Sequence, residues 1–231
     1  MITAFMTIDD IAAKNTAAIV DYLKEKNIPA VMFAVGDWAK NQYENAIYAV
    51  KNGIIVGNHS MSHPYFSQLS FEDAVAEIEN CEKFLDQLYA DAGVERKIRP
   101  FRFPYGDRGG ENQEKLAQYL IDRGFDKLDD SRIKKPEWDP LRKAADTLWT
   151  FDAEEWQIRP HSGKTMDYVF ERMEDRNPPY GFPLLEDGLH HFLIFHSHDE
   201  TEAMVPEYYK IIVDRFLSYG IKFLEPEFVK L

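Results

Sequence analysis

The regular alternation of short apolar runs with amphipathic segments constrains the fold of this chain more than any other feature. The apolar runs are rich in β-branched and aromatic residues, as buried strands are, and the segments between them repeat apolar residues at the spacing of a helix face. The expected strands are residues 2–8, 29–35, 54–59, 98–103, 147–152, 190–196 and 221–224, and the expected helices are residues 15–27, 41–53, 71–93, 112–124, 165–175 and 206–220. This order predicts an α/β fold with a parallel sheet covered by helices.

The number of these units limits the architecture further. Roughly seven strand–helix units follow one another, and such repeats either close into a barrel or form an open doubly wound sheet. The length of 231 residues suits one large domain and no repeat or linker divides it, so we expect a single domain over residues 1–231. Residues 126–146 are highly charged and contain two prolines, which predicts a loop excursion between two units.

Composition excludes several classes of protein. Forty acidic residues against 27 basic ones give a formal net charge of −13, which repels nucleic acids and anionic membrane surfaces. Hydrophobic residues make up 45% of the chain, which is enough for a large core. Cys81 is the single cysteine, so no intrachain disulfide can form, and its helical surroundings predict a packing role.

The sequence carries no recognisable membrane or export signal. No apolar run reaches the length of about 18 residues that a membrane span needs. The N-terminal stretch "MITAFMTIDD" also lacks the basic and then apolar pattern of a signal peptide. We therefore expect either a cytoplasmic protein or a trimmed form of an exported or cell-wall protein, and the oligomeric state stays open.

Most side chains with useful chemistry fall just after the expected strands. In barrels and in open α/β sheets alike, the loops at the carboxyl ends of the strands build the functional site. The residues at these ends are Asp9, Asp10, His59, Arg102 to Tyr105, Asp152 to Trp156 and His196. They are therefore expected to meet at one edge of the sheet.

Two motifs at these strand ends suggest a metal site. "HSMSH" places His59 and His63 at a spacing that lets two imidazoles bind one divalent ion, and "TIDD" supplies two adjacent carboxylates, Asp9 and Asp10. Each motif alone has an ordinary alternative, since the histidines also suit a polar turn ended by Pro64 and the Asp pair suits a solvated turn. Together, two histidines and one aspartate form a three-ligand site with an open coordination position, and the other aspartate can act as a base.

Five motifs in a fixed order carry a resemblance to a known family. They are "TIDD", "HSMSH", "RFPY", "DAEEW" and "LIFH", and the resemblance covers residues 3 to about 224. With these motifs the chain resembles the polysaccharide deacetylase family, also called the NodB-homology family or carbohydrate esterase family 4. The resemblance implies a distorted (β/α)7-type barrel, the NodB-homology fold.

The resemblance also implies roles for the residues around the metal. Asp9 matches the catalytic base, and Asp10, His59 and His63 match the ligands of a divalent metal, with Zn²⁺ expected and Co²⁺, Ni²⁺ or Mn²⁺ as alternatives. Two further roles come from "RFPY": Arg102 matches the residue that hydrogen-bonds the base, and the backbone N–H of Tyr105 matches the donor to the oxyanion.

The acid side of the site is less regular. His196 matches the general acid that protonates the leaving amine, and His198 is its rival because alternation on a strand places both on one face. Glu155 stands where the family has the aspartate that orients this histidine, so the carboxylate reaches it differently or tunes its pKa less tightly, and Asp152 is an alternative. Trp156 is expected either to wall the site or to pack in the core. The remaining histidines of interest, interpreted as structural or surface residues, are His161, His190 and His191.

The resemblance implies a metal-dependent hydrolase that removes acetyl groups from N-acetylated amino-sugar polysaccharides or oligosaccharides of the chitin or peptidoglycan type. Such an enzyme is a carbon–nitrogen bond hydrolase acting on linear amides, and its partner is an acetylated glycan. The alternatives are an acetyl-xylan esterase or small-amide hydrolase on the same fold, and a catalytically silent carbohydrate-binding domain. The sequence leaves the glycan, its chain length and the native metal open.

Overall fold

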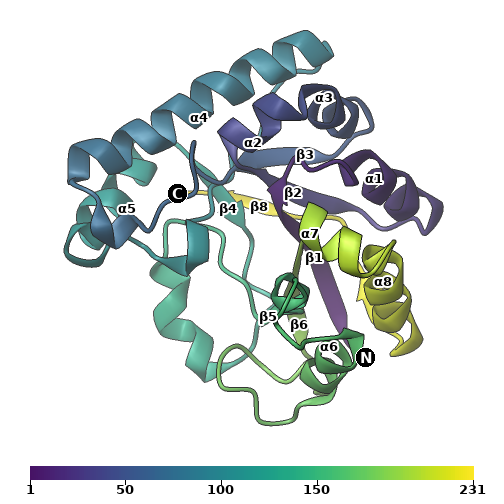
Figure 1. The fold of residues 1–231 in the computed structure, drawn as a ribbon. Coiled ribbons are helices and arrows are strands. Elements are labelled where there is room, and N and C mark those ends of the chain that lie inside the picture. The colour runs from purple at the N-terminus through teal and green to yellow at the C-terminus, as the bar shows by residue number, and fades with distance from the viewer.

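The computed structural model describes residues 1–231 and shows a central sheet with helices packed around it (Figure 1). The strands are β1 Thr3–Ile11, β2 Ala30–Ala34, β3 Ile55–Asn58, β4 Asp126–Leu128, β5 Phe151–Asp152, β6 His190–His196, β7 Lys222–Phe223 and β8 Phe228–Lys230. The helices are α1 Thr16–Glu25, α2 Gly36–Asn41, α3 Tyr43–Lys51, α4 Phe71–Ala92, α5 Gln113–Asp122, α6 Met166–Glu174, α7 Asp199–Met204 and α8 Tyr208–Ser218.

The main sheet is parallel, with the order β3-β2-β1-β6-β5 and with β7 also paired to β1. Parallel pairing brings the carboxyl ends of these strands to one edge. The register places Asp9 of β1 beside His196 of β6, and Ala34 of β2 beside Asn58 at the end of β3. The predicted α/β fold with a parallel sheet is therefore confirmed, and residues far apart in the chain meet at one edge.

The wall of the barrel is irregular between β3 and β5. Only isolated parallel bridges join Asn58 to Phe101 and Pro100 to Asp126, so the strand expected over residues 98–103 is wrong. Pro100 has no N–H to give to a ladder, which limits pairing there. Residues 147–150 close the gap, because the Thr147 N–H donates to the Phe101 carbonyl and the Thr150 N–H to the Phe192 carbonyl.

These irregular pairings make the structure a distorted barrel, as expected, but with fewer regular units than roughly seven. The main sheet has six strands, and the strand expected over residues 147–152 shrinks to β5. Its first residues still bond to neighbours on both sides without forming a regular ladder. The physical reason is that this segment crosses from Phe101 to β6. Its hydrogen bonds to these two neighbours set its path more strongly than its apolar content does.

Residues 126–146 are more ordered than a loop excursion. β4 pairs antiparallel with β8, and residues Pro136–Lys143 form 3₁₀ turns. Trp138 is buried and contacts Phe182 and Phe192 edge-on or tilted, at 5.9 and 6.1 Å between ring centroids. The loop prediction was therefore wrong for these parts, because a few buried apolar side chains fix a segment whose overall composition is charged.

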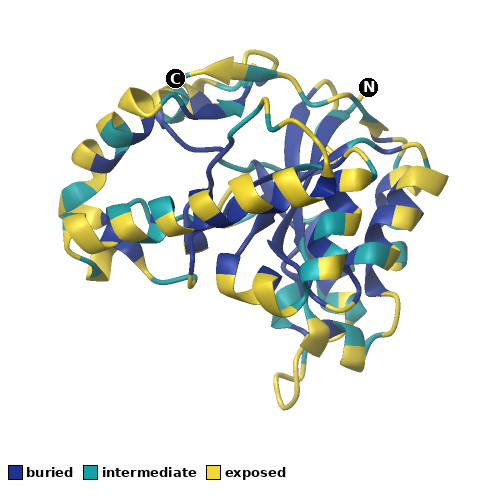
Figure 2. Ribbon diagram, turned by 90° about the horizontal axis from the view of Figure 1, so that it is seen from above, coloured by how far each residue is buried: buried dark blue, intermediate teal, exposed yellow.

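Alternation along β1 separates the two sides of the sheet. Met6 and Ile8 belong to the main core beneath the helices, whereas Phe5 belongs to a separate cluster on the opposite face. Thr7 and Asp9 continue the face of Phe5 toward the carboxyl end. Figure 2 shows the central strands buried and the outer faces of the helices exposed, so the inward-facing positions of β1 lead up to the site.

Helix α4 shows how local sequence sets an element that covers this sheet. The Ser70 hydroxyl accepts a hydrogen bond from the Asp73 N–H at the start, and Gly93 ends the helix with a φ of 70°, a conformation that glycine adopts without strain. Cys81 lies buried on the inner face of α4 and donates to the Ala34 carbonyl, as its predicted packing role requires. None of the helices combines the length and the apolar sequence that a membrane-spanning helix requires.

Candidate active site

A cavity of about 840 Å³ opens at the carboxyl ends of the parallel strands. Carboxylates, histidines and aromatic side chains line it together, from β1, β6 and the loops after β3 and β5. The lining includes Asp9, Asp10, His59, His63, Asp152, Trp156, His196 and His198. Most predicted site residues therefore share one cavity, although they come from distant parts of the chain.

The conformation of Asp10 explains how two adjacent aspartates face the same cavity. Neighbouring residues on a regular strand point to opposite faces. Asp10 instead has a φ of 64°, and the pairing of β1 with β2 shifts register between Ile8 and Ile11. Both carboxylates consequently line the cavity while remaining almost fully buried, with Asp9 3% and Asp10 5% exposed.

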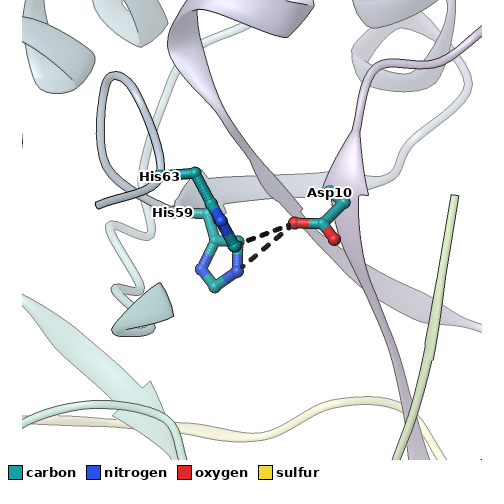
Figure 3. Close-up of side chains that lie close together, drawn as sticks. All are labelled: Asp10, His59 and His63. Atoms are coloured by element: carbon teal, nitrogen blue, oxygen red, sulfur yellow. Dashed lines mark ion pairs between the residues drawn. The ribbon is translucent and has the colours of Figure 1, made fainter. Parts of the chain in front are cut away.

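The carboxylate of Asp10 points toward both histidines of "HSMSH" (Figure 3). Its Oδ1 lies 3.2 Å from the His63 Nε2 and 3.6 Å from the His59 Nε2. The turn that delivers the histidines is tight, with Ser60 and His63 both at positive φ and the Ser60 hydroxyl accepting from the His63 N–H. One potential ligand atom from each of the three side chains lies within 4.8 Å of the others.

The protonation and bonding of these groups suit a divalent cation. The Nδ1 of His59 donates to the Arg102 carbonyl at 2.8 Å, which leaves its Nε2 as the free ligand atom, and burial lowers the pKa of His59 to about 4, so the ring is neutral. Burial acts to raise the pKa of Asp10, but the interactions of its carboxylate with His198 and His63 outweigh it and hold that pKa well below its usual range. The Asp10 Oδ1 is buried without a hydrogen-bond partner, which a cation among two imidazoles would satisfy.

Arg102 holds Asp9 on the other side of this cluster. Its Nη1 lies 2.6 Å from the Asp9 Oδ1, and the guanidinium is fully buried. The same side chain donates to the Thr7 hydroxyl and to the carbonyls of Thr147 and Leu148. One oxygen of Asp9 is thus fixed, while its Oδ2 lies 3.5 Å from the His59 Nε2, beside the cluster.

Across the cavity, Glu155 reaches His196 in spite of its extra methylene. The Glu155 Oε1 accepts from the His196 N–H and lies 3.1 Å from the His196 Nδ1. Burial acts to lower the pKa of His196, but the charges of Asp152 and Glu155 outweigh it and raise the pKa to about 10, while burial raises the pKa of Asp152. His198 contacts Asp10 instead, with 2.6 Å between Nε2 and Oδ2, so the two rival histidines have different partners.

Comparison with known proteins places the chain in a family. A model of the family described as polysaccharide deacetylase matches residues 2–124, more than half of the chain. The chain belongs to the polysaccharide deacetylase family.

Two relatives illustrate the sequence similarity of the chain to members of this family. A peptidoglycan-N-acetylmuramic acid deacetylase of Bacillus subtilis is 28% identical over 144 residues, which cover 62% of this chain and 24% of the relative. A peptidoglycan-N-acetylglucosamine deacetylase of Bacillus cereus is 36% identical over 104 residues, which cover 44% of this chain and 35% of the relative. The matched part thus spans about a quarter to a third of these relatives' length.

Solved structures show the shared deacetylase fold. A peptidoglycan N-acetylglucosamine deacetylase superposes with a TM-score of 0.63 at 20% identity, covering 96% of this chain and 85% of that one. A family 4 pseudoenzyme from Bacillus anthracis superposes with a TM-score of 0.59 at 19% identity, covering 96% and 62%. The NodB-homology fold is therefore confirmed, and the residue roles stay predictions.

Two tyrosines form an exposed aromatic surface beside the histidine pair. Tyr105 has a φ of 58°, and its ring stacks on Tyr65 with 4.0 Å between centroids and 12° between planes. Its ring also meets that of His63 edge-on, at 4.5 Å between centroids. The role of the Tyr105 N–H as oxyanion donor stays a prediction, and the stacked rings offer a flat surface at the cavity.

The outer histidines and Trp156 behave differently from one another. His190 and His191 lie at the amino end of β6, buried and hydrogen-bonded to the hydroxyls of Thr3 and Thr150, which gives them structural roles. His161 is exposed on a loop. Trp156 lines the cavity, with 6.4 Å between its ring centroid and that of His196, so it walls the site.

Sequence reasoning missed the second acid of "DAEEW". Glu154 is buried with a φ of 59° and accepts hydrogen bonds from Arg172 on α6 and from the Tyr180 hydroxyl, each within 2.8 Å. Tyr180 in turn lines the cavity. Glu154 thus fixes the wall behind the acid side, and no sequence signal connects it to Arg172 and Tyr180, which lie 18 and 26 residues further along the chain.

Replacing Glu155 with Gln is expected to move the alkaline limit of activity to lower pH. The amide carries no charge, so the pKa of His196 should fall from about 10 toward its ordinary value of 6.5. The ion pair between protonated His196 and Glu155 also stabilises the fold. This stabilisation is complete below pH 6.5 and is lost as the pH rises through about 10, because the pKa of His196 is higher in the folded state than in the unfolded state. The pH profile of turnover checks this, with exposed Glu171→Gln as control, and identical profiles for both variants would contradict it.

Proposed function

We propose that this chain is a metal-dependent hydrolase that removes acetyl groups from N-acetylated amino sugars in a polysaccharide or oligosaccharide. The observation that carries the proposal is that three groups meet at one cavity. They are a potential cation site, the Asp9 carboxylate, which is bound by Arg102, and the His196 ring, which is bound by Glu155. Hydrolysis of an amide needs an electrophile, a base and an acid, and these three groups supply them.

Asp10, His59 and His63 would hold the cation, with Zn²⁺ as the proposed ion and Co²⁺, Ni²⁺ or Mn²⁺ as alternatives. When bound there, a divalent cation supplies positive charge that polarises a carbonyl oxygen and lowers the pKa of water. The ring of His59 is already held for this role by the Arg102 carbonyl. A ligand set of two imidazoles and one carboxylate would leave positions open for reactants.

Asp9 and His196 would move the protons. Asp9 accepts a proton from the attacking water at Oδ2, since Arg102 occupies its Oδ1. As the new C–O bond forms and the C–N bond breaks, the His196 Nε2 gives a proton to the departing amine, because Glu155 occupies its Nδ1. The products are acetate and a free amino group. A Tyr105 N–H directed at the developing oxyanion would contribute about 3 kcal/mol.

The substrate class rests on the cavity and on the relatives. Two relatives are named as peptidoglycan deacetylases, which supports an N-acetylated glycan. The stacked and half-exposed rings of Tyr65 and Tyr105 offer a face for a sugar ring. We therefore propose a peptidoglycan-type or chitin-type glycan as substrate.

Acetate release from a panel of substrates tests the proposed function. We expect release from N-acetyl chitooligosaccharides or peptidoglycan fragments, loss of release after chelation, and recovery after Zn²⁺ or Co²⁺ is added back, because the carbonyl is poorly polarised without the cation. Acetylated xylan and small cyclic amides complete the panel.

Three results would contradict the proposal in different ways. Release from acetylated xylan alone would indicate an esterase, and turnover of cyclic amides alone would indicate a small-amide hydrolase. Glycan binding without turnover under any of the four metals would indicate a silent carbohydrate-binding domain.

A further inference from the structure

His198 is delivered to the cavity by a braced turn after β6. The Ser197 N–H donates to the Asp9 carbonyl at 3.0 Å, which continues the pairing of β6 with β1 beyond His196. The His198 N–H donates to the Tyr208 hydroxyl at 3.0 Å, and that hydroxyl donates to the His196 carbonyl. Tyr208 is fully buried on α8, so a hydrogen bond to a core side chain fixes the backbone of His198.

The two oxygens of Asp10 face different partners. Oδ1 lies toward His59 and His63 and has no hydrogen-bond partner. Oδ2 lies 2.6 Å from the His198 Nε2. One oxygen of the carboxylate thus faces the potential cation site, and the other contacts His198.

His198 itself stands outside the group of potential ligands. Asp10, His59 and His63 form one group whose ligand atoms lie within 4.8 Å of one another, Asp152, Glu155 and His196 form another, and His198 belongs to neither. His198 contacts Oδ2 of Asp10, and not the Oδ1 that lies toward His59 and His63. This is the arrangement of a residue that orients a metal ligand and does not bind the metal itself.

We propose that His198 is a positioning residue for the cation site, donating its Nε2–H to the Asp10 Oδ2 and thereby keeping Oδ1 directed at the two histidines. The inference rests on the proposed cation site but not on catalysis. The hydrogen bond from His198 is the one side-chain hydrogen bond that the Asp10 carboxylate accepts, because Oδ1 has no partner. Without this bond no hydrogen bond would fix the orientation of the carboxylate, and ordering it would cost part of the binding free energy.

Zn²⁺ affinity of the purified chain, measured by competition with a chromophoric chelator, tests this role without any substrate. We expect His198→Ala to weaken Zn²⁺ binding by about 10–100-fold, the usual effect of losing an outer partner of a ligand. His198→Gln places an amide N–H near the position of the Nε2–H and should recover most of the affinity. His161→Ala removes an exposed histidine and should bind as wild type does.

The absorption spectrum of the Co²⁺-loaded protein separates an orienting residue from a direct ligand. We expect the His198→Gln spectrum to match wild type, because the ligand atoms are unchanged. A His198→Ala variant that binds Zn²⁺ as tightly as wild type would overturn the inference, and so would a changed Co²⁺ spectrum in His198→Gln. Absence of Zn²⁺ binding in the wild type would overturn both this inference and the metal dependence of the proposed function. Thermal unfolding of each apo variant shows whether it is folded.

Discussion

Asp9→Asn is expected to reduce turnover by about 10²–10⁴-fold, the range for loss of a general base. The amide has nearly the same shape as the carboxylate but does not accept a proton at neutral pH. Its oxygen can still accept from Arg102, whose other three acceptors are unchanged. We therefore expect the variant to fold, with a lower stability because the buried Arg102 loses its counter-charge, and the loss of turnover to appear in kcat.

Metal content and acetate release, measured on the same preparation, check this prediction. Asp9 is not one of the three clustered ligands, so the variant should bind one equivalent of Zn²⁺ as wild type does. Asp122→Asn, at the exposed end of α5, is the matched control and should keep full activity. Near wild-type turnover in Asp9→Asn would remove Asp9 as the base.

Arg102→Leu is expected to destabilise the fold by about 3–5 kcal/mol and to abolish activity, because removing one partner of a buried ion pair leaves the other charge uncompensated. Arg102 is fully buried, and Asp9 is 3% exposed. The substitution also leaves the Thr147 and Leu148 carbonyls without their donor, at the point where the barrel wall is irregular. For a domain of this size the unfolding midpoint should fall by roughly 6–20 °C.

Chemical denaturation of four variants separates the charge effect from the packing effect. Arg176→Leu, at an exposed position, is the control and should cost less than about 0.5 kcal/mol. Asp9→Asn combined with Arg102→Leu should be more stable than the sum of the single changes predicts, because it no longer buries an unpaired carboxylate. Additive effects, or wild-type stability in Arg102→Leu, would show that the pair does not hold the site together.

The strand–helix alternation predicted the parallel sheet because strands that are buried on both faces need continuous apolar runs. It failed for residues 98–103 and 126–146, where a proline and a few isolated apolar contacts decide the path. Periodicity reports the burial of whole elements. Periodicity carries little information about a segment that makes only isolated contacts with its neighbours in the barrel.

Within the site, the motifs located the groups but not all of their contacts. The sequence placed Asp9, His59 and His196 at strand ends, and the sheet register brings these ends together. Whether Glu155 could reach His196 was open, because the extra methylene changes the reach of the carboxylate. In the structure the loop after β5 places Glu155 fully buried against the His196 ring, so the longer side chain does reach it.

The sequence by itself determined the kind of fold, the family and the chemical groups available at one edge of the sheet. Only the tertiary structure decided that Asp10 turns into the cavity beside Asp9, and that His196 and His198, two residues apart, contact different carboxylates. The reason is physical. Periodicity fixes the face of a side chain on a regular element, whereas a contact at a strand end depends on local φ values and on side chains such as Tyr208 that are distant in sequence.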